Sequence, residues 1–574
     1  MQWMTIATPP LESVEQFDAV LAGQSSEPDG LEARYVGTTE NRELRIVAVW
    51  ESKAHADRFF TQTLGPALAK ALGPEPAGKP EVVGFAVARA YTGKPVGRRN
   101  EHGRPVGAHA NTPSYGPAGT DSATPRPRHL QARRQPVQRG DQGCGTGWGA
   151  AFRDTMVTPR RWVGLRGRRQ GVGLVKIAIV GGGIGGLTAA LALRQAGFDV
   201  DVYEQAAVLR EVGAGVAVGS NAVRVLHRLG LADAVRAVGV ASQSWDHRDW
   251  HSGAVLGRLP LADFALVRWG APFYNMHRAD LHDALRAAVG DRHITFGARC
   301  VSVDEHDETV TVTFADGRRA RANVVIGADG IHSVVREYVA GPDQPTSWGQ
   351  IAWRGLAPAP VGREVGLEMR QHLFLGPGAM FVTYYVASGR LVNWVGFVPS
   401  DGWREESWST RGDRDEALMF YARWHPQVRA LIAGTEAVFK WALFDRPPLE
   451  TWTRGRVTLL GDAAHPMLPF MGQGAAQSIE DGWVLARCLA ADRDDPPRGI
   501  RTYAARRREG AAALQTASRN AGGQLQLSDP AEVGARNARM LGDPDAQVAA
   551  FDWVWGYDVE NALADGWASS PQTC

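Results

Sequence analysis

The clearest pattern in the chain is an apolar segment followed by a glycine-rich turn, a helical segment and a second strand-like segment. Residues 174–180 are apolar and β-branched apart from Lys176, which is typical of a buried parallel strand. A helical pattern then runs to Gln195, and residues 199–204 alternate polar and apolar positions until Glu204. This pattern predicts a βαβ unit with both strands in one parallel sheet.

The turn after the first strand has the spacing G-x-G-x-x-G. Its first glycine permits a tight turn, its second lets the backbone approach a pyrophosphate, and its third lets helix and strand pack closely. The helix N-terminus offers unpaired N–H groups to phosphate, and Glu204 stands where an acid binds a ribose hydroxyl. The motif predicts a dinucleotide site and leaves NAD and FAD open. Its candidate contacts are Gly181, Gly183, Ile184, Gly185 and Gly186.

Residues 1–92 show a different pattern of short strands and two helices. Strands are predicted at 3–6, 31–36, 44–50 and 82–90, and helices at 11–21 and 52–72. This βαββαβ order predicts a ferredoxin-like α+β domain. It resembles the small dimeric α+β barrel proteins that include antibiotic-biosynthesis monooxygenases. The resemblance implies a small-ligand or monooxygenase site in the barrel, or an accessory module that forms a homodimer. We favour the module because no chemistry-bearing cluster stands out.

Residues 93–173 are rich in Gly, Pro and Arg and lack apolar periodicity. Such a composition buries too little surface to offset the entropy of ordering, so we predict a disordered linker. Two alternatives stay open. One is a basic segment that binds RNA or anionic lipid; the other is translated intergenic sequence between two joined reading frames. In the second case, Met156 or Val175 is the expected start of the downstream enzyme.

Length and composition narrow the class of protein. A chain of 574 residues is expected to contain two or more domains. The net charge of +2 gives no argument for nucleic acid or membrane as a partner. Four scattered cysteines without a C-x-x-C pair predict neither a metal site nor a disulfide framework. With no visible signal peptide or transmembrane stretch, we expect a cytoplasmic protein.

Two later strands also end in glycine-rich turns that carry an aspartate. The strand at 322–326 leads into Asp329, and the strand at 456–460 leads into Asp462. Each aspartate alone is typical of a helix cap. Ligands in open α/β sheets bind at the carboxyl ends of strands, however, so three such ends together predict one nucleotide site. Further candidate positions at these ends are Gly330, Gly461, Pro469, Gly472, Gln473 and Gly474, and a helix is predicted at 475–486.

Together these motifs resemble the group A flavoprotein aromatic hydroxylases, which have the p-hydroxybenzoate hydroxylase fold, and the salicylate hydroxylase-like branch in particular. The resemblance covers about 174–560 and includes the aromatic run at 551–558. It implies an α/β architecture for residues 174–574. A Rossmann-type FAD-binding domain is expected at about 174–345 and 452–500, an antiparallel substrate sheet at about 346–451, and C-terminal helices at about 500–560.

The resemblance also implies how the cofactors bind. Glu204 is expected at the adenosine ribose of FAD and Asp462 at the ribityl chain, and Asp329 is tied to both FAD and nicotinamide binding. The N–H groups of Ala475 and Ala476 are placed to stabilise the anionic reduced flavin. Because there is no second G-x-G-x-x-G, NAD(P)H is expected to dock without a Rossmann domain of its own. Two further arginines are expected to face the cofactor, Arg210 and Arg278.

The chemistry implied is monooxygenation. Reduced flavin and O₂ form a C4a-hydroperoxide, which transfers oxygen to an electron-rich ring in a site that excludes water. Pro469 is expected beside the hydroperoxide, and Tyr384 aligns with a tyrosine of the active site. Relatives often carry a histidine base four residues before that tyrosine, where this chain has Met380. This departure predicts an unusual substrate.

We therefore predict an NAD(P)H- and FAD-dependent monooxygenase that acts with O₂ on an aromatic or polycyclic small molecule. Two alternatives remain from the sequence. One is an FAD-dependent epoxidase or reductase on an alkene, because the same fold hosts such enzymes. The other is a flavin-binding interaction protein without turnover, against which the three intact FAD motifs argue.

Overall fold

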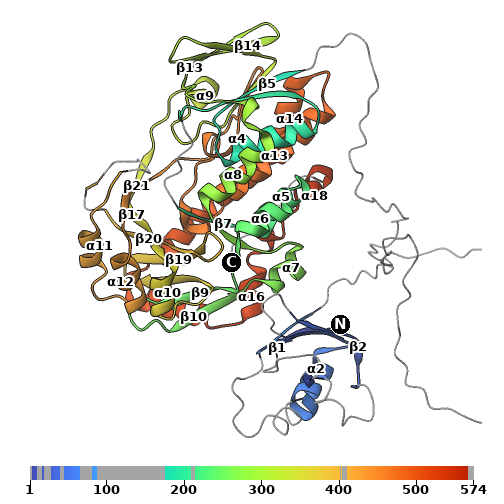
Figure 1. Cartoon of the computed structure of the whole chain (residues 1–574), viewed down its shortest axis with the longest axis vertical. Helices are drawn as coiled ribbons and strands as arrows, with labels where there is room; N and C mark the ends of the chain where they lie inside the picture. The colour runs from blue at the N-terminus through green and yellow to red at the C-terminus, as the bar shows by residue number, and fades with distance from the viewer. Residues whose placement is uncertain are drawn as a thin grey trace, which may run out of the picture. The chain divides into compact units, whose positions relative to one another are not determined.

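The computed structural model describes residues 3–8, 16–17, 28–38, 44–64, 81–86, 175–207, 214–400, 402–403 and 410–565. The chain forms two compact units, Met1–Thr155 and Met156–Cys574 (Figure 1). The predicted linker at 93–173 and the candidate residue Arg210 lie outside the described residues.

The first unit contains a four-stranded antiparallel sheet in the order β2-β3-β1-β4. Its strands are β1 (Trp3–Thr8), β2 (Leu31–Thr38), β3 (Leu44–Trp50) and β4 (Glu81–Ala86). The described helix α2 (Lys53–Phe59) continues as a π-helical turn, η1 (Phe60–Leu64), where the sequence predicted a helix at 52–72. Trp50 is buried against Phe59 and donates its indole N–H to Thr5 Oγ1 at 2.9 Å.

A six-stranded sheet forms the centre of the second unit, in the order β12-β6-β5-β16-β23-β22. All its neighbouring strands are parallel except β22 and β23. The predicted βαβ unit is β5, α4 and β6. The strands are β5 (Lys176–Val180), β6 (Asp199–Tyr203), β12 (Ile294–Thr295), β16 (Val324–Gly327), β22 (Thr453–Arg454) and β23 (Val457–Leu459), and the helix is α4 (Ile184–Gln195).

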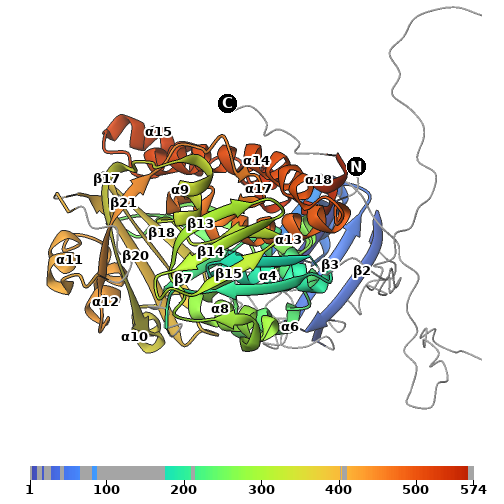
Figure 2. The ribbon, with the colours of Figure 1, turned by 90° about the horizontal axis from the view of Figure 1, so that it is seen from above.

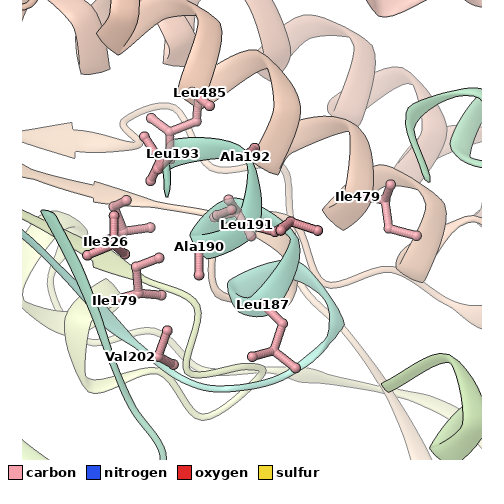
Figure 3. Packing of buried hydrophobic residues seen from close by; sticks show 14 of the residues in the cluster. Ile179, Leu187, Ala190, Leu191, Ala192, Leu193, Val202, Ile326, Ile479 and Leu485 are labelled. Atoms are coloured by element: carbon pink, nitrogen blue, oxygen red, sulfur yellow. The ribbon is translucent and has the colours of Figure 1, made fainter. Parts of the chain in front are cut away.

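The first apolar segment of the sequence, which forms β5, is buried in the core of this unit. Figure 3 shows Ile179 and Val202 of the strands facing Leu187 of α4, while Ile479 of α13 (Gly474–Ala491) lies on the other side of α4. The helix predicted at 475–486 is α13, which continues beyond residue 486 to Ala491. α4 packs against both α13 and α8 (Arg278–Val289).

A seven-stranded sheet lies beside the nucleotide-binding part, in the order β10-β9-β18-β19-β20-β17-β21 (Figures 1 and 2). The sheet was predicted to lie within 346–451, but two of its strands, β9 and β10, come from residues 244–260. They belong to this sheet because β9 pairs in parallel with β18. One face packs on α11, α12 and the residues between them, through aromatic contacts such as Phe381 with Tyr421. The strands are β9 (Ser244–Asp249), β10 (Val255–Pro260), β17 (Thr346–Pro358), β18 (Gln371–Gly376), β19 (Ala379–Val386), β20 (Leu391–Pro399) and β21 (Phe439–Asp445), and the helices are α11 (Arg414–Phe420) and α12 (Pro426–Ala433).

Two three-stranded sheets and several helices complete the unit. The sheets are β7-β11-β8, with β7 (Gly215–Val218), β11 (Tyr274–His277) and β8 (Val240–Ala241), and β13-β14-β15, with β13 (Cys300–His306), β14 (Thr309–Phe314) and β15 (Arg319–Ala322). The remaining helices are α5 (Ser220–Arg228), α6 (Ala232–Val238), α7 (Asp263–Trp269), α9 (Val334–Ala340), α10 (Ala359–Glu364), α14 (Pro496–Leu525), α15 (Pro530–Met540), α16 (Pro544–Ala549), α17 (Asp552–Trp555) and α18 (Val559–Asp565), with short turns η2 (Asp291–His293), η3 (Gly461–Ala463) and η4 (Pro469–Met471). Within the described residues, no helix is both long and apolar enough to cross a membrane.

Candidate active site

The glycine-rich turn between β5 and α4 has the geometry that a bound pyrophosphate requires. Gly181 has a φ of +109°, and a Cβ there would lie 2.1 Å from the carbonyl oxygen of Ala328, so no other residue fits. A Cβ at Gly186 would lie 2.0 Å from the carbonyl oxygen of Gly181. By contrast, nothing lies within 4 Å of a Cβ at Gly183. The turn is therefore closed on the protein side and open beside Gly183, at the N-terminus of α4.

Glu204, at the end of β6, is tied to this turn. Its carboxylate accepts hydrogen bonds from the N–H groups of Gly182 at 2.7 Å and Ala206 at 2.8 Å. On the opposite side of the turn, His282 Nε2 donates to the carbonyl oxygen of Gly182 at 2.7 Å. A carboxylate has about four acceptor positions. Glu204 thus fixes the loop and retains acceptor capacity for ribose hydroxyls.

Asp329 caps a helix in this structure. Its carboxylate accepts hydrogen bonds from Ser333 Oγ at 2.5 Å and from the N–H groups of Val334 at 2.8 Å and Val335 at 3.2 Å, at the start of α9. Burial raises the pKa of Asp329. The structure thus shows the helix-cap role that the sequence also allowed, and the contact of Asp329 and Gly330 with the cofactors stays a prediction.

Asp462 differs from Asp329 because its side chain is exposed and has no hydrogen-bond partner among the described residues. The carboxylate lies beside the start of α13, where a Cβ on Gly474 would be 3.9 Å from Asp462 Oδ1. The first N–H groups of α13, which include those of Ala475 and Ala476, have no partner within the helix. A carboxylate and a helix N-terminus side by side fit the ribityl chain and the polar edge of a flavin ring.

A buried network of charged side chains lies next to the turn at Gly461. Asp481 accepts hydrogen bonds from Arg507 Nε at 2.7 Å, from His465 Nε2 at 2.5 Å and from the N–H of Gly461 at 3.1 Å. Glu480 forms an ion pair with Arg507 at 2.8 Å. Burial alone raises the pKa of Asp481, but the interactions with His465 and Arg507 outweigh it and lower the pKa to about 2. The network holds the backbone of the Gly461 turn in place.

The same network also contacts Gln473, which directly precedes α13. Asn221 of α5 donates to Glu480 at 2.6 Å and to Gln473 Oε1 at 3.2 Å. Four residues of this network were not predicted from the sequence as parts of the site: Asn221, Glu480, Asp481 and Arg507. An adjacent pair of acids in an otherwise apolar helix was the available signal, since such acids are buried only when they are paired.

The flavin loop, defined here as residues 461–474, meets the seven-stranded sheet. Pro469 opens η4, and the ring of the next residue, Phe470, lies 5.2 Å from the ring of Phe397 on β20. Phe397 is opposite Met380 of β19, which is buried. The loop predicted to hold the flavin is thus in contact with the strands predicted to hold the substrate.

Tyr384 lies at this junction too. A Cβ on Gly215 of β7 would be 2.6 Å from Tyr384 Cε2 and 2.5 Å from Cγ of Asn393. Burial raises the pKa of Tyr384, so its hydroxyl is neutral at physiological pH. Met380 and Tyr384 are four residues apart on one strand and therefore face the same side of the sheet. Arg278 is the first residue of α8, and its N–H donates to the carbonyl oxygen of Ala214 at 2.8 Å.

The fold joins a glycine-rich turn of the dinucleotide-binding type, at the end of a parallel sheet, to a seven-stranded sheet, as expected for a flavoprotein. Residues 174–518 match the FAD binding domain family. A 3-amino-4-hydroxybenzoate 2-monooxygenase of Streptomyces platensis is 39% identical over 386 residues, which cover 67% of this chain and 96% of the relative. A 6-hydroxynicotinate 3-monooxygenase of Bordetella bronchiseptica is 35% identical over 390 residues, with coverage of 67% and 96%. The crystal structure of Klebsiella pneumoniae HpxO with FAD and uric acid superposes with a TM-score of 0.60 at 29% identity, and the match covers 65% of this chain and 94% of that one.

The chain belongs to the FAD binding domain family and is an FAD-dependent monooxygenase. The predictions of FAD as the cofactor and of a salicylate hydroxylase-like monooxygenase are confirmed by these matches. The family match begins at residue 174, after the first unit. The ferredoxin-like assignment of residues 1–92 and the individual cofactor contacts therefore stay predictions.

Proposed function

We propose that this enzyme hydroxylates an amino- or hydroxy-substituted aromatic ring, with NAD(P)H as the reductant and O₂ as the oxidant. The contact between the flavin loop and the substrate sheet, at Phe470 and Phe397, carries the proposal. This contact supports the proposal because it brings the predicted flavin loop against the predicted substrate strands, and the reaction needs both next to each other and shielded from water. When bound, reduced FAD would supply the electrons that activate O₂.

The side chain at position 380 favours an amine-bearing ring. Relatives that activate a phenol through a histidine need that base to raise the electron density of the ring. Met380 cannot accept a proton, and Tyr384 on the same face is neutral, so neither is a base at physiological pH. A ring that already carries an amino group needs no such step. Similarity to two 3-amino-4-hydroxybenzoate 2-monooxygenases of Streptomyces species also supports this class.

The test is turnover of the FAD-loaded full chain on 3-amino-4-hydroxybenzoate, 6-hydroxynicotinate, salicylate and unsubstituted benzoate. NADH or NADPH oxidation, peroxide release and product mass are measured together. We expect a product one oxygen atom heavier and little peroxide with the amino-substituted ring, and mostly peroxide with salicylate. Tightly coupled hydroxylation of salicylate would refute the argument from Met380. Absence of NAD(P)H oxidation with every compound would favour a non-catalytic flavoprotein.

We propose for residues 1–92 an accessory dimerisation module with a ferredoxin-like fold. The antiparallel order β2-β3-β1-β4 and the buried core around Trp50 support a separately folded unit. A shortened protein that begins at Val175 with an added Met is expected to retain FAD and turnover but to be monomeric, as measured by light scattering. A dimer of the shortened protein would refute the module, and loss of folding would refute the linker assignment of 93–173.

A further inference from the structure

A row of polar side chains crosses the seven-stranded sheet next to the flavin loop. Tyr384 is opposite Asn393, and Gln371 is opposite Trp245. The pairing of β18 with β19 sets Gln371 beside Tyr384. Cross-strand neighbours point to the same face of a sheet. The polar row, Trp245–Gln371–Tyr384–Asn393, therefore lies on the face that contacts Gly215.

Three members of the polar row have buried polar atoms without a hydrogen-bond partner. These atoms are Trp245 Nε1, Gln371 Oε1 and Asn393 Nδ2, and each residue is at most 6% exposed. The orientation of the Asn393 amide is fixed, because its Oδ1 accepts a hydrogen bond from the N–H of Gly215 at 2.7 Å. Its Nδ2 is thus a free donor. Buried polar groups are nearly always paired, so three together point to a missing partner.

A fourth unpartnered atom faces the polar row from the nucleotide-binding part. Asn275 of β11 is 1% exposed, and its Oδ1 has no partner. Asn275 is opposite Ala217, which points to the same side of β7 as Gly215. That side contacts Tyr384 and Asn393, and a Cβ on Gly472 of the flavin loop would lie 3.7 Å from Ala217 Cβ. The unpartnered atoms therefore border the junction between flavin loop and substrate sheet.

We propose that Asn275, Gln371 and Asn393 bind the ring substituents of the substrate through uncharged hydrogen bonds. Gln371 Oε1 and Asn275 Oδ1 accept from a donor such as a ring amino group, and Asn393 Nδ2 donates to an oxygen substituent. The substrate class is then an aromatic ring that carries both a hydrogen-bond donor and an acceptor, such as an aminophenol. This inference rests on the proposed function and adds the residues that select the ring.

The test compares two ligands that differ by one donor. 3-Amino-4-hydroxybenzoate and 4-hydroxybenzoate are titrated into the FAD-loaded full chain, and Kd is read from the change in flavin absorbance. We expect the wild type to bind the amino compound at least tenfold more tightly. Gln371→Leu and Asn275→Leu are expected to reduce that ratio fivefold or more, because each removes an acceptor from a buried site and keeps a side chain of similar size.

Two variants separate recognition from folding. Gln371→Glu keeps an acceptor oxygen and should retain the preference for the amino compound. Thr383→Val removes a hydroxyl from the opposite face of β19, where Thr383 donates to the carbonyl oxygen of Asn393 at 2.9 Å, and should leave the ratio unchanged. FAD content of every variant is measured alongside. Should a leucine variant fail to fold, the other leucine variant and the Glu variant still decide the question.

The outcomes distinguish this inference from the proposed function. If the wild type hydroxylates the amino compound while both leucine variants keep the wild-type ratio of affinities, the unpartnered atoms hold water and the inference alone is wrong. If the wild type prefers 4-hydroxybenzoate, the assignment of Gln371 and Asn275 as acceptors for the substrate is also wrong. If neither compound changes the flavin absorbance or stimulates NAD(P)H oxidation, the proposed function and the inference are both wrong.

Discussion

Replacement of Asp481 by alanine tests whether the buried charge network supports the flavin loop. Asp481 is fully buried and accepts three hydrogen bonds, from Arg507, His465 and the N–H of Gly461. The substitution leaves these three donors without their acceptor, and Arg507 retains the ion pair with Glu480 as its one remaining partner of opposite charge among the described residues. The lost bond to the N–H of Gly461 affects the turn that carries Asp462, the carboxylate predicted to bind FAD.

The expected loss of stability follows from known costs of such changes. Removing one partner of a buried ion pair costs about 3–5 kcal/mol. The unfolding entropy is about 2.1 cal/mol/K per residue, so the roughly 400 residues of the second unit give about 0.8 kcal/mol/K. The midpoint of thermal unfolding should therefore fall by about 4–6 °C, and FAD should bind more weakly.

The assay follows tryptophan fluorescence and flavin release during heating of the FAD-loaded protein. The matched control is Asp233→Ala, which removes an aspartate from an exposed ion pair with Arg236 at 2.6 Å. Such surface pairs contribute at most about 1 kcal/mol, so the midpoint should move by no more than about 1 °C. A midpoint for Asp481→Ala within about 1 °C of the wild type would show that the network does not stabilise the fold.

The network also predicts a response to acid. The pKa of Asp481 is about 2 in the folded protein, below its ordinary value of 3.8. A lowered pKa means that the stabilisation is complete above about pH 4 and is lost as the pH falls toward 2. A shift of nearly two pH units corresponds to about 2 kcal/mol. In Asp481→Ala this part of the acid sensitivity should be missing, as measured by unfolding midpoints between pH 5 and 2.

Further predictions concern the cofactor and the substrate base. Asp462→Ala should weaken FAD binding about ten- to hundredfold, because it removes a charge-assisted hydrogen bond worth about 1.5–3 kcal/mol. Equilibrium dialysis measures the Kd for FAD, and an unchanged Kd would show that Asp462 does not bind the cofactor. Gly181→Ala should abolish FAD binding because its Cβ overlaps the carbonyl oxygen of Ala328, whereas Gly183→Ala should fold and lose only affinity. FAD should be released into the supernatant by acid precipitation, and colour in the pellet would indicate a covalent bond. Met380→His should raise the yield of hydroxylated phenol per NAD(P)H, since a positioned base is worth about 10²–10⁴-fold; unchanged coupling would show that position 380 is not the place of a base.

The nucleotide-binding half was predictable because local sequence decides it. An apolar strand, a glycine turn and a terminal acid are consecutive in the chain, and the structure gives β5, α4 and β6 in that order. The roles of Gly181 and Gly186 follow from backbone geometry alone, and the close approach of other backbone atoms at both positions agrees with them. The position of Asp329 shows the limit of such reasoning, because a helix cap and a cofactor ligand have the same sequence signature.

The substrate side depends on contacts between residues far apart in the chain. Asn393 meets Gly215, and Asn221 meets Glu480, across 178 and 259 positions. No periodicity in the sequence indicates such pairs. The addition of β9 and β10 to the sheet could not be predicted for the same reason, since the parallel pairing of β9 with β18 joins distant segments such as Trp245 and Gln371.

The two groups of buried polar side chains around the flavin loop differ in one physical respect. Asp481 and Arg507 are each other's partner within the protein, so this pairing needs no ligand, and loss of either side chain leaves the other as an uncompensated buried charge. Asn393 and Gln371 leave atoms unpaired, which is unfavourable for the protein alone and becomes favourable only when another molecule supplies the partner. Substitutions in the first group should therefore change unfolding and FAD affinity together, and substitutions in the second should change the choice of substrate while the fold is kept.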